Sequence, residues 1–92
     1  MEFGTKIREL REAKGISLRK FAIDCGVSAT YQSKIERGDF KPPSAEVISR
    51  MAGVLGLNID VTALEAGKIP EWIKEVLYSK PEESVEVLRG LK

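Results

Sequence analysis

Apolar residues recur every three to four positions along almost the whole chain, and no segment alternates in the manner of a β-strand. Glycines and prolines interrupt the pattern at short intervals, so it predicts several short helices. The expected helices span about residues 5–14, 18–25, 29–37, 45–55, 58–67, 70–78 and 81–91. We therefore expect an all-α fold, with a five-helix body followed by one or two short C-terminal helices.

Short hydroxylated side chains precede or open four of the expected helices. A Ser or Thr oxygen at such a position accepts a hydrogen bond from a free backbone N–H of the first turn. The four expected caps are Thr5, Ser17, Ser28 and Ser44. Between the third and fourth helices, the two prolines within residues 39–44 forbid a continuous helix and predict a loop.

The stretch EAGKIP, residues 65–70, marks the expected boundary between two parts of the chain. The first part, residues 1–67, is the five-helix body, and the second, residues 68–92, is a C-terminal extension. Apolar side chains follow each other at helical spacing in the extension, where they either pack back on the body or form a subunit interface. The interface candidates are Trp72, Ile73, Val76, Leu77 and Leu88.

The most specific pattern lies between the second and third expected helices. Ala22 is small enough for a neighbouring helix to cross over it. Gly26, four residues later, can adopt the left-handed conformation that a tight turn requires. Val27 and Ile35 would then fill the angle between the two helices. Two short helices joined in this way form a helix-turn-helix.

The 92 residues carry a net charge of +1, but the charges are unevenly placed. Residues 1–50 hold ten basic and seven acidic side chains, whereas residues 51–92 hold five basic and seven acidic ones. The first half is therefore the favoured side for a polyanionic partner, although a charged surface can equally be a solvated one.

The residue types present exclude several classes of function. The chain has no histidine and a single cysteine, Cys25, which excludes an internal disulfide, a zinc site and a histidine-based catalytic triad. We expect Cys25 to be a small core residue, and we expect no cofactor, no metal and no enzyme activity. Neither a leader segment nor a membrane-length apolar run is present, which favours a cytoplasmic location.

The stretch LREAKGISLRKFAIDCGVSATYQSKIERGDFKPPSAEVISRMAGVLGL resembles the helix-turn-helix of the phage repressor and Cro class, also called the XRE family. The resemblance covers about residues 4–66, and SKIERG followed by PPS is close to a family signature. It implies a five-helix bundle whose third helix lies in the major groove of DNA. It also implies a salt bridge between Arg11 and Glu36 that joins the first helix to the third.

The resemblance assigns roles to individual side chains. It places Ala29, Thr30 and Lys34 nearest to base edges. Helical spacing puts Ser33 on the same exposed face of the third helix, so the expected base-contacting residues are Ala29, Thr30, Ser33 and Lys34. The residues expected at phosphates are Ser17, Arg19, Ser28, Tyr31, Arg37 and Lys41. The residue chemistry agrees, because small side chains permit close approach to bases and a lysine can reach guanine O6 or N7.

Two positions depart from the family pattern. Leu18 stands where many members have a glutamine that braces the contact with the DNA backbone. Gln32 stands where an apolar residue is usual, and it either hydrogen-bonds at the helix junction or turns toward DNA.

We therefore expect a transcriptional regulator, in particular a repressor, that binds double-stranded DNA as a homodimer. The extension could also bind a further protein partner. We expect no contact with a membrane. Two alternatives remain, namely the antitoxin of a toxin–antitoxin pair and a protein-interaction module that does not bind DNA.

Overall fold

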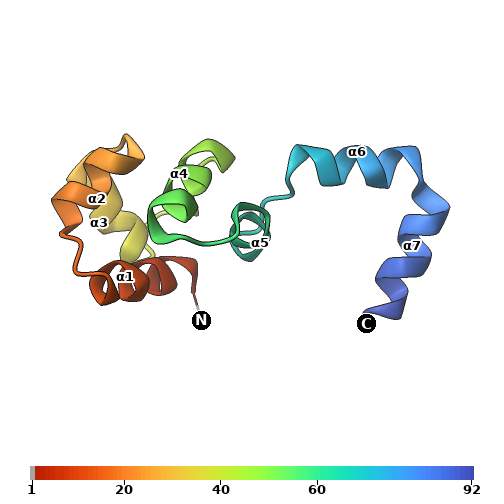
Figure 1. Cartoon of the computed structure of the whole chain (residues 1–92), viewed down its shortest axis with the longest axis horizontal. Helices are drawn as coiled ribbons and strands as arrows, with labels where there is room; N and C mark the ends of the chain where they lie inside the picture. Colours follow the sequence, from red (N-terminus) through yellow and green to blue (C-terminus); the bar gives the residue numbers. More distant parts are fainter. Residues whose placement is uncertain (1) are drawn as a thin grey trace.

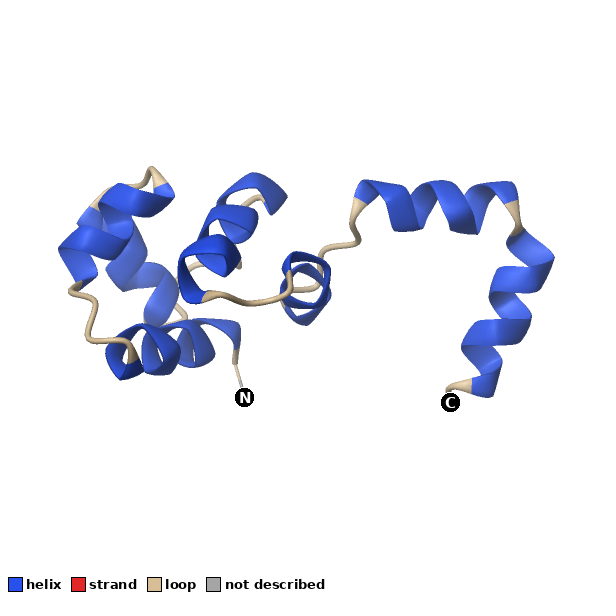
Figure 2. Cartoon of the chain, in the orientation of Figure 1, coloured by secondary structure: helices blue, strands red, loops and turns tan. Residues whose placement is uncertain are grey.

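The computed structural model describes residues 2–92, and within that range every regular element is an α-helix (Figure 2). The helices are α1 (Phe3–Ala13), α2 (Leu18–Cys25), α3 (Ala29–Glu36), α4 (Ala45–Leu55), α5 (Ile59–Glu65), α6 (Glu71–Ser79) and α7 (Pro81–Gly90). The expected all-α class is confirmed, and six of the seven helices begin within one residue of the predicted position.

Three of the four expected caps are present. The hydroxyl oxygens of Ser17, Ser28 and Ser44 accept hydrogen bonds from the backbone N–H three residues later, at 3.1, 3.0 and 3.4 Å. The prediction for Thr5 is wrong, because α1 already begins at Phe3 and Thr5 lies inside its first turn. The helix starts earlier because Phe3 packs against the core, which holds the chain in place ahead of any local cap.

Helices α1 to α5 enclose two adjoining apolar clusters. The larger contains Ile7, Phe21, Cys25, Ile35, Met51 and Leu55, and thus joins α1, α2, α3 and α4. The smaller contains Ile48, Ala63 and Ala66, and fixes α5 against α4. Helix α3 contributes Ile35 to the buried residues of the larger cluster, and Tyr31 packs against that cluster, while Thr30 is exposed on the other side of the helix.

Gly4 allows a close approach between α1 and α3. A Cβ atom at this position would lie 2.1 Å from the backbone carbonyl oxygen of Ile35, far inside van der Waals contact. The absent side chain therefore lets α1 pack directly on the backbone of α3, and it fixes the direction in which α3 projects from the body.

Helices α6 and α7 form an angled pair that projects from the body (Figure 1). They pack against each other, and neither contains a fully buried residue. Of the two expected arrangements of the extension, packing back over the body is therefore not found within this chain. The pair also lies at the opposite end of the molecule from α2 and α3, so it leaves α3 uncovered (Figure 1).

Candidate nucleic-acid interface

The turn between α2 and α3 has the predicted geometry. Gly26 adopts the left-handed conformation with φ of 72°, and Ala22 is 1% exposed. The Val27 N–H donates to the Ala22 carbonyl at 3.0 Å, which closes α2 and redirects the chain into α3. These bonds set the angle between the two helices of the helix-turn-helix.

Arg50, on α4, braces this turn from outside and was not identified from the sequence. Its guanidinium donates to the Cys25 carbonyl at 3.2 Å and pairs with Glu46 at 2.5 Å. The pairing with Glu46, four residues earlier on the same helix, is visible in the sequence. The contact with the turn is not, because it depends on how α4 packs against α2.

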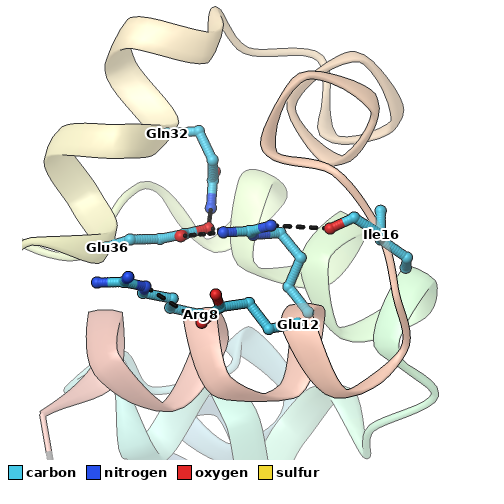
Figure 3. A network of polar contacts seen from close by, with 6 residues as sticks. Arg8, Glu12, Ile16, Gln32 and Glu36 are labelled. Carbon is cyan, nitrogen blue, oxygen red and sulfur yellow. Dashed lines mark hydrogen bonds and ion pairs between the residues drawn. The ribbon is translucent and has the colours of Figure 1, made fainter.

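A buried polar network joins α1 to α3 (Figure 3). Arg11 donates from two nitrogens to the two carboxylate oxygens of Glu36, each at 2.9 Å, and from a third nitrogen to the Ile16 carbonyl at 2.8 Å. This hydrogen bonding to Glu36 raises the pKa of Arg11, so the guanidinium stays charged. The predicted ion pair is present, and it orients α3 on α1.

Gln32 is completely buried and belongs to this network. Its Nε2 donates to Glu36 at 2.9 Å, which gives the carboxylate a third donor (Figure 3). Of the two predicted possibilities, hydrogen bonding at the helix junction is therefore the one found. Its Oε1 is buried without a protein partner in the part of the chain that the structure describes.

The face of α3 opposite the core carries the four residues expected at base edges. Thr30 is exposed, and Ala29, Ser33 and Lys34 are partly exposed on the same side. Gln32, Ile35 and Glu36 occupy the buried side. The helix thus presents short side chains at its N-terminal end and one long cation near its C-terminal end, as the sequence predicted.

An aromatic residue that the sequence analysis did not single out contacts this face. The Lys34 Nζ lies 5.2 Å from the centre of the Phe40 ring, within the range of cation–π attraction. The ring of Tyr31 lies 5.6 Å from that of Phe40. Through these contacts Phe40, in the loop after α3, packs against the side chains of Lys34 and Tyr31. Its place in a loop, without helical periodicity, left no signal of this contact in the sequence.

The residues expected at phosphates border the same face. The two cap residues, Ser17 and Ser28, lie at the starts of α2 and α3, where free N–H groups and the positive end of the helix dipole favour anions. Arg19 and Lys41 are exposed, and Arg37 pairs with Asp39 at 3.3 Å through a side chain that is 57% exposed. Whether these groups contact DNA stays a prediction.

Other kinds of site find no support in the described residues. Residues 2–92 contain no group of three His, Cys, Asp or Glu side chains arranged to hold a metal ion. Cys25 lies fully buried in the larger core cluster, as expected. None of the helices between residues 2 and 92 is long and apolar enough to cross a membrane.

Residues 2–70 match the sequence model of a family described as a helix-turn-helix domain. This chain belongs to the helix-turn-helix domain family. The resemblance noted in the sequence is thereby confirmed at the level of the family. Among its relatives, an uncharacterized HTH-type transcriptional regulator of Mycobacterium tuberculosis is 41% identical over 64 residues, covering 70% of this chain and 45% of that protein. SlrR of Bacillus subtilis is 38% identical over 56 residues, covering 61% of this chain and 37% of SlrR.

Solved structures of helix-turn-helix regulators share the fold. The structure of SinR, a master regulator for biofilm formation, in complex with DNA matches at a TM-score of 0.60 and 32% identity, covering 65% of this chain and 95% of that one. The clp gene regulator ClgR of Corynebacterium glutamicum matches at a TM-score of 0.60 and 30% identity, covering 94% of this chain and 85% of that one. The match spans about half the length of the curated relatives.

Proposed function

We propose that this helix-turn-helix protein is a transcription regulator that binds double-stranded DNA by inserting α3 into the major groove. The observation that carries the proposal is the geometry of α3. The buried residues Glu36 and Gln32 anchor the helix to the body, and Thr30 is exposed and Lys34 partly exposed on the opposite face. The complex of the related SinR with DNA supports the same function.

The chemistry of the open face suits base edges. Ala29 and Thr30 carry methyl groups that can contact the thymine methyl, and the Thr30 hydroxyl can also hydrogen-bond to a base. Lys34, further along the helix, can donate to guanine O6 or N7. Phosphate contacts from the exposed cations around this face would fix the register and supply most of the salt-dependent affinity.

We further propose that residues 1–67 bind DNA and that residues 68–92 join two copies of the chain. Apolar side chains on α6 and α7 are exposed in the single chain, including Trp72 at 56%, Val76 at 46% and Leu88 at 53%. The extension carries five basic and five acidic side chains, so two copies can meet without net repulsion. A symmetric dimer would present two copies of α3 about 34 Å apart, which is one turn of DNA.

A titration of labelled DNA tests the proposed function. Fluorescence anisotropy is recorded with a duplex of random sequence and with the matching single strand, at several salt concentrations. We expect binding to the duplex whose logarithmic affinity falls linearly with the logarithm of salt, because counterions are released from the phosphates. Absence of salt-dependent duplex binding would contradict the proposal and would favour a module that binds only protein.

A further inference from the structure

A cleft beside α3 brings together three arginines, two from α1 and one from the residue that follows α3. Its walls come from α1, from the first residue of α2 and from the C-terminal half of α3. The lining residues are Arg8, Arg11, Leu18, Ser33, Glu36 and Arg37, and the cleft has a volume of about 290 Å³. Three guanidinium groups and one carboxylate, that of Glu36, belong to this lining, while the carboxylates of Glu12 and Asp39 pair with Arg8 and Arg37 without lining the cleft.

Arg11 retains hydrogen-bonding capacity at the base of the cleft. A guanidinium carries five N–H donors, and three of those of Arg11 are used by Glu36 and Ile16. The other two remain for a further acceptor. The Glu36 carboxylate receives three donors, including one from Gln32, so most of its hydrogen-bonding capacity is used within the network.

The other two arginines are held by partners that an anion can replace. Arg8 pairs with Glu12 at 3.2 Å and Arg37 with Asp39 at 3.3 Å, and more than half of each arginine side chain is exposed. Exposed ion pairs of this kind contribute little, because water and salt screen them. A phosphate group accepts bidentate hydrogen bonds from arginine and is a stronger partner.

The position of the cleft connects it to the proposed DNA-binding surface. Leu18 is the first residue of α2, so the positive end of that helix borders the cleft. Ser33 and Arg37 lie on or directly after α3, and Ser17 precedes Leu18. The cleft therefore lies between two residues that the sequence analysis already placed at phosphates.

We infer that this cleft binds one phosphate group of the DNA backbone, and that Arg8 is a phosphate-contacting residue of the protein. The inference rests on the proposed function, because the backbone beside the groove passes the cleft only when α3 lies in that groove. Arg8 would then leave Glu12 and, together with Arg11 and Arg37, surround the phosphate.

Three variants test this inference in the same anisotropy titration. Arg8→Gln should lower the slope of log affinity against log salt by about 0.9 per bound chain, the value for one lost phosphate contact. Lys6→Gln, on α1, removes the same charge outside the cleft, where Lys6 pairs with Glu65 of α5, and should keep the wild-type slope. Glu12→Gln should keep the slope and bind no more weakly than wild type, because it frees Arg8 and removes a negative charge.

The outcomes separate the cleft from the overall function. Wild type without salt-dependent duplex binding would overturn both proposals. A wild-type slope for Arg8→Gln, in a protein that binds DNA normally, would overturn only the cleft. Equal weakening by Arg8→Gln and Glu12→Gln would also overturn it, since the ion pair would then act by holding α1 together. Thermal unfolding followed by circular dichroism shows that each variant is folded.

Replacement of single phosphates in the DNA identifies which phosphate Arg8 contacts. Once a bound sequence is known, each phosphate near the half-site is replaced in turn by a neutral methylphosphonate. We expect one replacement that weakens binding of wild type but has no further effect on Arg8→Gln. If every replacement weakens the two proteins by the same factor, Arg8 contacts no phosphate and the inference fails.

Discussion

Two contacts with α1 fix the position of α3 on the body. The absent side chain of Gly4 lets α1 approach the Ile35 carbonyl, and the Arg11–Glu36 ion pair then fixes the angle between the two helices. Both contacts lie on the side of α3 away from the open face. Changes at these residues should therefore act on stability first and on DNA binding only through the position of α3.

Gly4→Ala should destabilise the protein, because the added Cβ meets backbone that cannot move aside easily. Overpacking of this kind costs about 1–3 kcal/mol, which lowers the melting temperature of a domain this size by several degrees. Gly53→Ala is the matched control, since Gly53 lies within α4 and a Cβ there meets nothing within 4 Å. It should stabilise by about 0.5–1 kcal/mol. Equal effects of the two substitutions in thermal unfolding would refute the close approach of α1 and α3.

Cys25 should make stability depend on pH in the alkaline range. Burial, with a smaller effect of Asp24, raises the pKa of Cys25 from 9.0 to about 11. The folded state therefore holds the thiol proton more tightly, and this stabilisation is complete below about pH 9 and is lost as pH rises through 11. Two pKa units correspond to about 3 kcal/mol.

Denaturant unfolding between pH 8 and pH 11 measures this contribution, with Cys25→Ala as the reference. The two proteins differ only in the side chain at position 25, so the difference between the two curves isolates the thiol. We expect the stability of wild type relative to Cys25→Ala to fall across this range. Parallel curves would mean that the thiol is not shielded from water.

At the scale of the elements, the sequence predicts the helices of the body well because their signals are local. Ser17 and Ser28 bond to N–H groups three residues away, and Gly26 adopts its conformation within one turn. The start of α1 could not be predicted in this way, because tertiary packing of Phe3 overrides the cap that Thr5 offers.

Part of the candidate site was also beyond sequence reasoning. The helical spacing of Ala29, Thr30, Ser33 and Lys34 placed them on one face, but the contact of Phe40 with Lys34 depends on the path of the loop. The role of Arg8 could not be predicted either, because Arg8 and Arg37 line the same cleft only when α1 packs on α3. Contacts between elements carry no periodicity that a single sequence can reveal.

The α6–α7 pair should determine the oligomeric state. Val76→Glu places a charge within the exposed apolar stripe and should convert the dimer to a monomer, while the body keeps its melting temperature. Tyr78→Glu is the control, since Tyr78 is 78% exposed and lies outside the stripe on the same helix. Light scattering gives the mass, and the emission of Trp72, the only tryptophan, should shift to the red on dissociation. A monomeric wild type would contradict the proposed interface.

At the scale of the whole molecule, the two proposed surfaces lie at opposite ends. The helix-turn-helix occupies one end of the body and α6–α7 the other (Figure 1). Two chains can therefore associate through their extensions without covering α3. In this arrangement a dimer binds a two-fold symmetric site, and the separation of its half-sites reflects the distance between the two copies of α3.

Selection of bound duplexes from a random pool, with wild type and Lys34→Ala in parallel, tests the central claim most directly. For wild type we predict a two-fold symmetric consensus with half-sites about one DNA turn apart. For Lys34→Ala we predict the same consensus with base preference lost at one position in each half-site. Enrichment of no sequence by wild type, or an unchanged consensus for Lys34→Ala, would contradict the claim that the open face of α3 reads bases.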